Sequence, residues 1–196
     1  MDKNRLEAFS DGIMAIIITI MVLDLKVLHD PTWQSYLEAY PEYVSYALSF
    51  VFVALYWHSH HHLFHLAEKV NNKILWTNML GLFWLSFIPF AAASMGENSF
   101  KSITVTIYAV ILTLCLISYL FLVYQLCWLH GGNSDFSRAF KGHFKIYTTI
   151  VLNLSAATIS FFGWPKLAFL LLILTALMWF IPNRRFETEL SNRKIE

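Results

Sequence analysis

The chain has 196 residues, of which 57% are hydrophobic and 14% are charged, and its formal net charge is +1. Apolar runs of membrane length, separated by short polar stretches, indicate an all-α integral membrane protein. The charge is close to zero and forms no long basic or acidic block, which excludes nucleic acid as a partner. The expected partners are the lipid bilayer, ions and further copies of the chain.

Six apolar stretches approach the length of about 20 residues that a helix needs to cross a hydrocarbon core of about 30 Å. Proline and glycine residues such as Pro31, Pro41 and Gly163 mark the breaks between them. Nothing between the runs resembles a soluble domain, so residues 1–196 are expected to form one transmembrane domain. We predict six spanning helices, over residues 6–28, 43–66, 74–95, 102–129, 144–163 and 165–182.

The basic residues predict the orientation, because six spans place both termini on one side and short cytoplasmic loops are enriched in lysine and arginine. The side opposite the termini holds Lys26, Lys101 and Lys166. The side of the termini holds Lys3, Arg5, Lys69, Lys73, Arg138, Lys141, Lys145, Arg184, Arg185, Arg193 and Lys194. We therefore expect a multi-pass protein of the plasma membrane with both termini in the cytoplasm.

The first span opens with Arg-x-x-x-Phe-Ser-Asp-Gly at residues 5–12, and charge beside a membrane span is costly. Residues 13–28 alone would reach only about 24 Å, so the helix should extend back through Asp11. On that helix Glu7 lies one turn away with a like charge. A partner for Asp11 should therefore come from the second or third span, which offer Trp57, His60, His61, Trp76 and Asn78. The alternative is that Ser10 and Asp11 only cap the helix.

A different face of the first helix carries Gly12, Ile16, Thr19 or Ile20, and Leu23, which are spaced by three or four residues. Rings of such apolar side chains from several copies would form constrictions that gate by dewetting, and a threonine hydroxyl could coordinate a dehydrated cation. The alternative is that this stripe serves helix packing, since its periodicity alone does not define a channel.

The segment 5–12 resembles the signature that opens the first helix in the transmembrane-protein-175 family of potassium channels. The signature appears once, as in prokaryotic members, whose six-helix subunits assemble as tetramers. The resemblance extends over roughly the first half of the chain. It is carried by Arg5, Phe9, Ser10, Asp11, Gly12, Trp57, His60, His61, Leu63, Phe64, Asn78, Leu82, Pro89 and Phe90.

This resemblance implies a homotetrameric channel that prefers potassium to sodium, with the first helices lining a central pore. Ile16 then corresponds to the hydrophobic constriction and Thr19 to a polar ring, while Ile20 and Leu23 match pore-facing apolar positions. It also implies a structural hydrogen-bond network around the first helix, formed by Arg5, Ser10 and Asp11 with His60 or His61, Trp76 and Asn78.

The sequence lacks a Thr-Val-Gly-Tyr-Gly filter and an arginine ladder, so we expect a leak-like pore of weak selectivity without a voltage sensor. Apart from permeant potassium, no cofactor or bound metal is expected, and the chain is not expected to be an enzyme. The alternatives are a proton-permeable channel, a secondary ion transporter and, remotely, a di-iron enzyme. The last would use the His-x-x-His-His arrangement of His58, His61 and His62.

Overall fold

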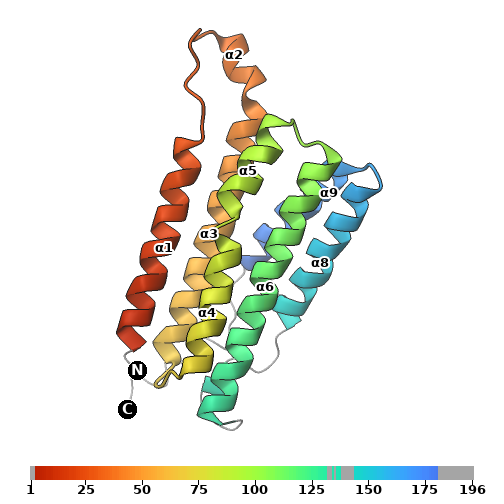
Figure 1. Ribbon diagram of the computed structural model, residues 1–196. Helices are drawn as coiled ribbons and strands as arrows, with labels where there is room; N and C mark the ends of the chain where they lie inside the picture. Colours follow the sequence, from red (N-terminus) through yellow and green to blue (C-terminus); the bar gives the residue numbers. More distant parts are fainter. Residues whose placement is uncertain (1–2, 132–133, 135, 138–143, 181–196) are drawn as a thin grey trace.

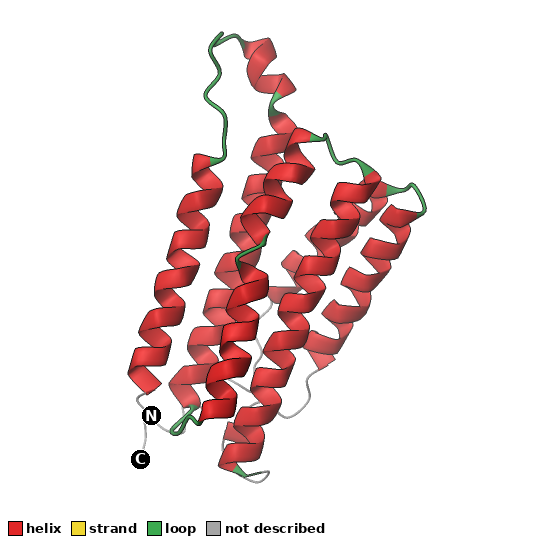
Figure 2. Cartoon of the chain, in the orientation of Figure 1, coloured by secondary structure: helices red, strands yellow, loops and turns green. Residues whose placement is uncertain are grey.

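The computed structural model describes residues 3–131, 134, 136–137 and 144–180. In these residues all regular structure is helical, and the long helices run side by side as one elongated bundle (Figures 1 and 2). The helices are α1 (Lys3–Leu23), α2 (Trp33–Glu38), α3 (Tyr40–Leu66), α4 (Asn72–Leu85), α5 (Ile88–Glu97), α6 (Ser102–His130), α8 (Phe144–Phe161) and α9 (Pro165–Trp179).

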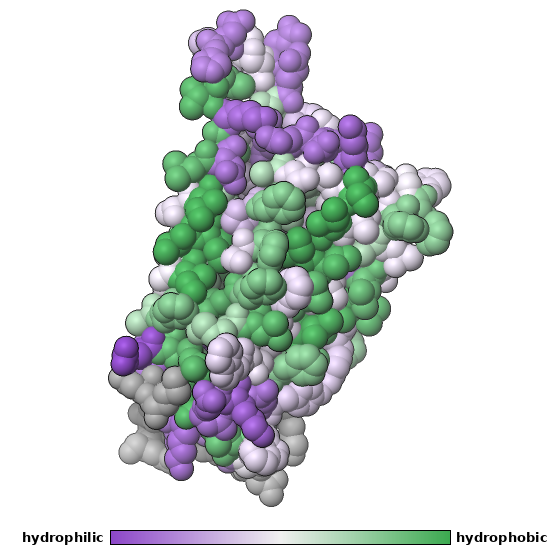
Figure 3. All heavy atoms as spheres, viewed as in Figure 1, coloured by the Kyte–Doolittle hydropathy of each residue, from purple (hydrophilic) through white to green (hydrophobic). Residues whose placement is uncertain are grey.

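Four segments are long and apolar enough to cross a membrane, namely α1, the combined α4 and α5, α6 and α8, while α9 is a shorter apolar helix. Helix α3 has 27 residues, but five histidines and three serines lower its hydropathy. Apolar side chains cover the middle of the visible face, and hydrophilic ones gather at its two ends (Figure 3). This arrangement fits a bilayer, so the chain is an all-helical membrane protein.

Helix α1 lies at one edge of the bundle, where it packs against α3, α4 and α5 (Figure 1). Helix α6 packs against α4, α5, α8 and α9. Apolar side chains of these helices fill the interior, and Val53, Leu85 and Tyr108 are among those excluded from solvent. One subunit is therefore a packed bundle with α1 at one margin.

The largest differences from the predicted helix boundaries are at the first and third spans. Helix α1 begins at Lys3 and ends at Leu23, five residues before the predicted end, and its 21 residues already span about 31 Å. The predicted third span is divided into α4 and α5 by a turn at residues 86–87. Pro89 causes this break, because it has no N–H group and its ring clashes with the carbonyl group one turn earlier.

A short helix, α2, lies in the connection between the first two predicted spans. Thr32 caps it, since its hydroxyl oxygen accepts a hydrogen bond of 3.1 Å from the backbone N–H of Ser35. At the other end of the chain, α9 ends at Trp179, and residues 181–182 of the predicted span lie outside the described residues. So do six of the basic residues used for orientation: Arg138, Lys141, Arg184, Arg185, Arg193 and Lys194.

Both ends of α1 are tied to the bundle by lysine side chains. At the N-terminal end, Lys3 Nζ donates hydrogen bonds of 3.1 Å to the carbonyl oxygens of Phe64 and Ala67, where α3 ends. Just beyond the C-terminal end, Lys26 Nζ lies 2.8 Å from Glu97 Oε1. The hydrogen bond and the charge of Glu97 raise the pKa of Lys26 above its ordinary value. Helix α1 is therefore held at both ends.

Replacing Gly96 by alanine should lower the stability of the subunit. The added Cβ would lie 2.8 Å from the Cα atom of Glu42, and backbone atoms cannot move aside cheaply. We expect the free energy of unfolding to fall by about 1–3 kcal/mol, measured by thermal unfolding in detergent with tryptophan fluorescence. Gly12→Ala is the matched control, because nothing lies within 4 Å of its new Cβ. An unchanged unfolding midpoint for Gly96→Ala would contradict this packing.

Candidate functional site

A buried chain of hydrogen bonds joins α1 to α4 and α3. Ser10 Oγ donates to the carbonyl oxygen of Leu6 at 2.8 Å and accepts from Asn78 Nδ2 at 2.9 Å. Asn78 Oδ1 then lies 2.9 Å from His60 Nε2. Ser10, Asn78 and His60 are almost completely excluded from solvent. Three helices are thus connected through polar side chains that water does not reach.

The direction of these bonds determines the tautomer of His60. Because Asn78 uses its amide nitrogen toward Ser10, its oxygen faces the imidazole and must accept a proton. His60 therefore carries a hydrogen on Nε2. The Nδ1 atom is buried without a hydrogen-bond partner among the described residues. The network thus uses His60 as a donor through Nε2.

A second contact joins α1 to α3 one residue further along. Trp57 Nε1 donates a hydrogen bond of 3.0 Å to Asp11 Oδ1, so the carboxylate has a partner on a neighbouring helix. The ring of His61 stacks on Trp57 with centroids 5.6 Å apart, and its Nδ1 lies 3.9 Å from Glu7 Oε1. We call the two sets of hydrogen bonds, Ser10–Asn78–His60 and Asp11–Trp57, the α1 clamp.

The α1 clamp brings together only part of the predicted network. Ser10, Asp11, Asn78 and His60 belong to it, whereas His61 contacts Glu7 and Trp57 at its side. Arg5 and Trp76 are exposed and make no hydrogen bond with another described residue.

Trp57 and Lys3 complete the attachment of α1. The sequence offered Trp57 only as one candidate among several. Lys3 carried no sequence signal, because its partners are backbone carbonyl groups.

The opposite face of α1 is open. Gly12, Ile16, Thr19, Ile20 and Leu23 lie along it and are exposed in the single subunit; we call these five residues the open stripe. The exposed fractions of the three large side chains are 57% for Ile16, 44% for Ile20 and 80% for Leu23. The packed face of the same helix carries Leu6, Ser10, Met14, Ile17 and Met21. The clamp and the open stripe thus lie on opposite faces.

Thr19 is the hydroxyl-bearing member of the open stripe. Its Oγ1 donates a hydrogen bond of 2.8 Å to the carbonyl oxygen of Ile16, so its proton is directed toward the helix backbone. The lone pairs of the same oxygen remain available on the exposed side. Such an oxygen can accept a hydrogen bond from water or coordinate a cation.

Four of the five histidines near the end of α3, namely His58, His61, His62 and His65, lie along one side of the helix, whereas His60 faces Asn78 inside the bundle. His58 Nε2 and His62 Nε2 are 3.0 Å apart, and the His61 and His65 rings stack with centroids at 6.1 Å. Within the described part of the chain, no three His, Cys, Asp or Glu side chains are arranged to hold a metal ion.

The helical bundle, with α1 held by the clamp and exposed along the open stripe, belongs to the class of α-helical membrane proteins. The family model described as the endosomal/lysosomal potassium channel TMEM175 matches residues 5–89, which include the clamp and the open stripe. A protein of Chryseobacterium sp. (strain P1-3) that is named a potassium channel is 42% identical over 97% of this chain and 98% of its own length. The chain therefore belongs to the TMEM175 family.

Two further relatives extend the comparison. The crystal structure of a lysosomal potassium-selective channel TMEM175 homolog from Chamaesiphon minutus superposes with a TM-score of 0.77 and 25% identity, over 90% of this chain and 95% of that chain. The human protein named endosomal/lysosomal proton channel TMEM175 is 31% identical over 46% of this chain and 20% of its own length. These relatives carry the names of channels rather than of enzymes.

Asn78→Leu should destabilise the subunit, because it leaves the buried Nε2–H of His60 without an acceptor. We expect a loss of about 1–3 kcal/mol in unfolding free energy, measured by thermal unfolding in detergent. The additional substitution His60→Phe should recover part of this loss by removing the orphaned donor. Asn72→Leu is the matched control, since Asn72 is exposed at the start of α4. Equal stability of the Asn78 and Asn72 variants would contradict the role of the clamp.

Proposed function

We propose that this chain is a subunit of a potassium channel in which the first helices of four copies line a central pore. The observation that carries the proposal is the open stripe, which lies on a helix held firmly from its other face. The names of the bacterial relatives support potassium as the permeant ion. The tetramer is the assembly that the family resemblance implies.

Packing within the subunit supports an ion path between copies rather than through one copy. The two hydrophobic clusters of the described residues, which make up most of the subunit's core, are built from packed apolar side chains and give a hydrated cation no polar surface. Helix α1 instead lies at the margin with one face uncovered. The uncovered faces of α1 from four subunits, placed around one axis, would enclose an ion pathway without any change within the subunit.

In this proposal each subunit crosses the membrane six times, through α1, α3, the combined α4 and α5, α6, α8 and α9. Lys3, Arg5, Lys69, Lys73 and Lys145 lie on segments at one end of the bundle. The positive-inside bias assigns that end, and with it both termini, to the cytoplasmic side of the plasma membrane. Trp33 and Tyr36 on α2 would then lie at the outer interface.

Different residues of the open stripe would form the gate and provide the ion selectivity of the pore. Ile16 would form an apolar ring that is narrow enough to lose water and so block ions, with Ile20 and Leu23 as further apolar rings toward the outside. Thr19 would place a ring of hydroxyl oxygens between them. Gly12 would leave space at the inner mouth, because it has no side chain.

Selectivity in such a pore should be weak. A ring of threonine oxygens offers a few ligands to a partly dehydrated cation, whereas a carbonyl filter replaces the whole hydration shell. The larger hydration penalty of sodium would give potassium a modest advantage. Conduction would be leak-like, since no described span carries a ladder of arginines.

Proton permeation is a second candidate function, favoured by the name of the human relative as a proton channel. A single-file chain of water molecules through the Ile16 ring could conduct protons whenever the ring is hydrated. A pH-sensitive dye inside liposomes would detect such flux alongside potassium flux, and an unchanged internal pH under a potassium gradient would exclude it.

Reconstituted channels should conduct potassium, and Ile16→Asn should increase the flux severalfold. The physical reason is that a carboxamide retains water in the constriction. Potassium flux into liposomes is the measurement. Ile103→Asn, at a similarly exposed position on α6, is the control for general disturbance of the bilayer and should leave the flux unchanged. Absence of potassium flux in the wild type would refute the channel, and equal flux in Ile16→Asn would move the gate elsewhere.

Thr19→Ala should lower the permeability ratio of potassium to sodium, because it removes the ring of hydroxyl oxygens. Thr19→Ser is the matched control: it retains the oxygen and should retain most of the selectivity. Reversal potentials under bi-ionic conditions give the ratio directly. If alanine and serine variants select equally, the hydroxyl does not coordinate the ion.

A further inference from the structure

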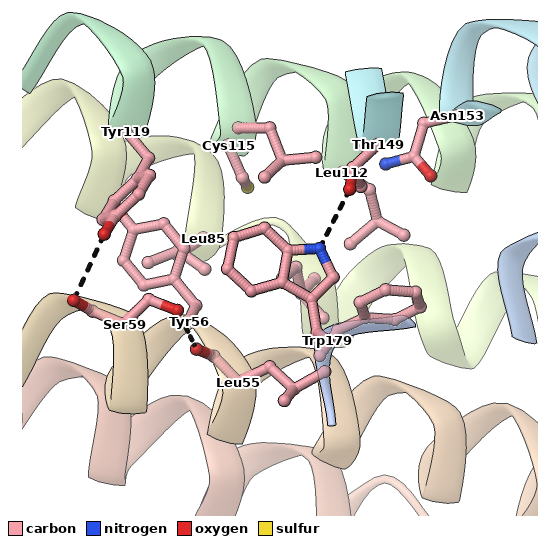
Figure 4. Close-up of a pocket in the computed structure, with 13 residues that line it drawn as sticks. Leu55, Tyr56, Ser59, Leu85, Leu112, Cys115, Tyr119, Thr149, Asn153 and Trp179 are labelled. Atoms are coloured by element: carbon pink, nitrogen blue, oxygen red, sulfur yellow. Dashed lines mark hydrogen bonds between the residues drawn. The ribbon is translucent and has the colours of Figure 1, made fainter. Parts of the chain in front are cut away.

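A partly open cavity lies away from α1 and is lined by residues of α3, α4, α5, α6, α8 and α9 (Figure 4). Together with the open solvent at its mouth, its empty space amounts to about 510 Å³. The proposed pore does not use it. Helix α9 bounds one side through Trp179, which belongs to its last turn.

Most of the cavity wall is apolar, and none of its lining residues is charged. Leu112, Cys115 and Leu116 line it from α6, while Phe52 and Leu55 line it from α3. A charged ligand would lose its hydration here without gaining a counterion. The wall therefore favours a neutral molecule with an apolar body.

A carboxamide in the wall has no hydrogen-bond partner among the described residues. Asn153 is completely buried, and neither Oδ1 nor Nδ2 finds a partner among the described residues. Its neighbour Thr149 is already engaged, since it donates to the carbonyl of Lys145 at 2.8 Å and accepts from Trp179 Nε1 at 2.9 Å. A buried amide without partners is costly. Asn153 therefore offers an unused donor and an unused acceptor side by side.

Two further polar side chains in the wall are bonded to backbone carbonyl groups. Tyr119 Oη donates to the carbonyl oxygen of Ser59 at 3.2 Å, and Ser59 Oγ donates to that of Leu55 at 2.8 Å (Figure 4). Asn153 differs from them, because both polar atoms of its buried side chain lack a partner among the described residues. The cavity thus combines an apolar wall with one carboxamide that requires a complementary partner.

We propose that this cavity binds a small neutral amphiphile whose head group carries a hydrogen-bond donor and acceptor on neighbouring atoms, as a primary carboxamide does. Such a head pairs with Asn153 through two hydrogen bonds, and a short alkyl body packs against the wall from α3 and α6. Tyr56 also lines the cavity, and its ring stacks on His60 of the clamp with centroids 6.2 Å apart. A bound molecule therefore touches the residue that packs against the attachment of α1.

Thermal unfolding of the purified full-length protein with three probes tests this proposal without reference to conduction. Butanamide should raise the unfolding midpoint in a saturable manner. The ketone 2-pentanone has nearly the same shape but only an acceptor, and butylammonium carries a charge, so both should give a much smaller shift. Equal shifts for all three probes would overturn the proposal. So would the absence of a shift with butanamide, because water alone would then satisfy Asn153.

Two variants locate the effect. Asn153→Leu should weaken the apparent affinity for butanamide by about tenfold or more, since it removes both hydrogen bonds. Cys115→Leu should also weaken binding, because it fills part of the cavity while Asn153 stays in place. Asn72→Leu repeats the chemical change of the first variant outside the cavity and should bind as the wild type does. Unaltered binding by Asn153→Leu would place the ligand elsewhere.

Discussion

The hydrogen bonds from Ser10 through Asn78 to His60 are the constraint on which the rest of this structure depends. A helix at the edge of a bundle in lipid gains little from hydrophobic association, because lipid tails are as apolar as its neighbours. Polar groups buried away from water resist separation more strongly, since each would lose its partner. The α1 clamp therefore fixes the rotation of α1 about its axis, and that rotation decides which residues remain uncovered.

The clamp also explains why charge and proposed conduction are separated on α1. Asp11 receives a hydrogen bond from Trp57 on the packed side, while Gly12, one position further, lies on the open stripe. Thr19 directs its proton to the backbone of its own helix, which leaves oxygen lone pairs on the exposed surface. In the proposed pore, the uncharged residues of the open stripe contact the ion, and Asp11 helps to hold α1 in place.

The helical periodicity of apolar residues predicted much of the fold, and it also indicated which histidine belongs to the clamp. His60 lies seven residues after the buried Val53 and four before the buried Phe64, so the helical repeat favours His60 over His61 as the residue that faces the bundle. The same reasoning could not separate Trp57 from Trp76, since either indole could reach a carboxylate on a neighbouring helix. Only the packing of α3 against α1 brings the Trp57 nitrogen to Asp11. The bonds from Lys3 to backbone carbonyl groups had no signature in the sequence.

The sequence by itself determined that this is an all-helical membrane protein, where most of its helices lie, and that α1 has a polar start and a periodic uncharged stripe. These features depend on local composition and on the helical repeat, which are properties of the chain alone. Tertiary structure decided the partner of each polar group, the break between α4 and α5, and the burial of Asn153 at a partly open cavity. Those outcomes depend on distances between helices that are remote in sequence, and side-chain packing sets such distances.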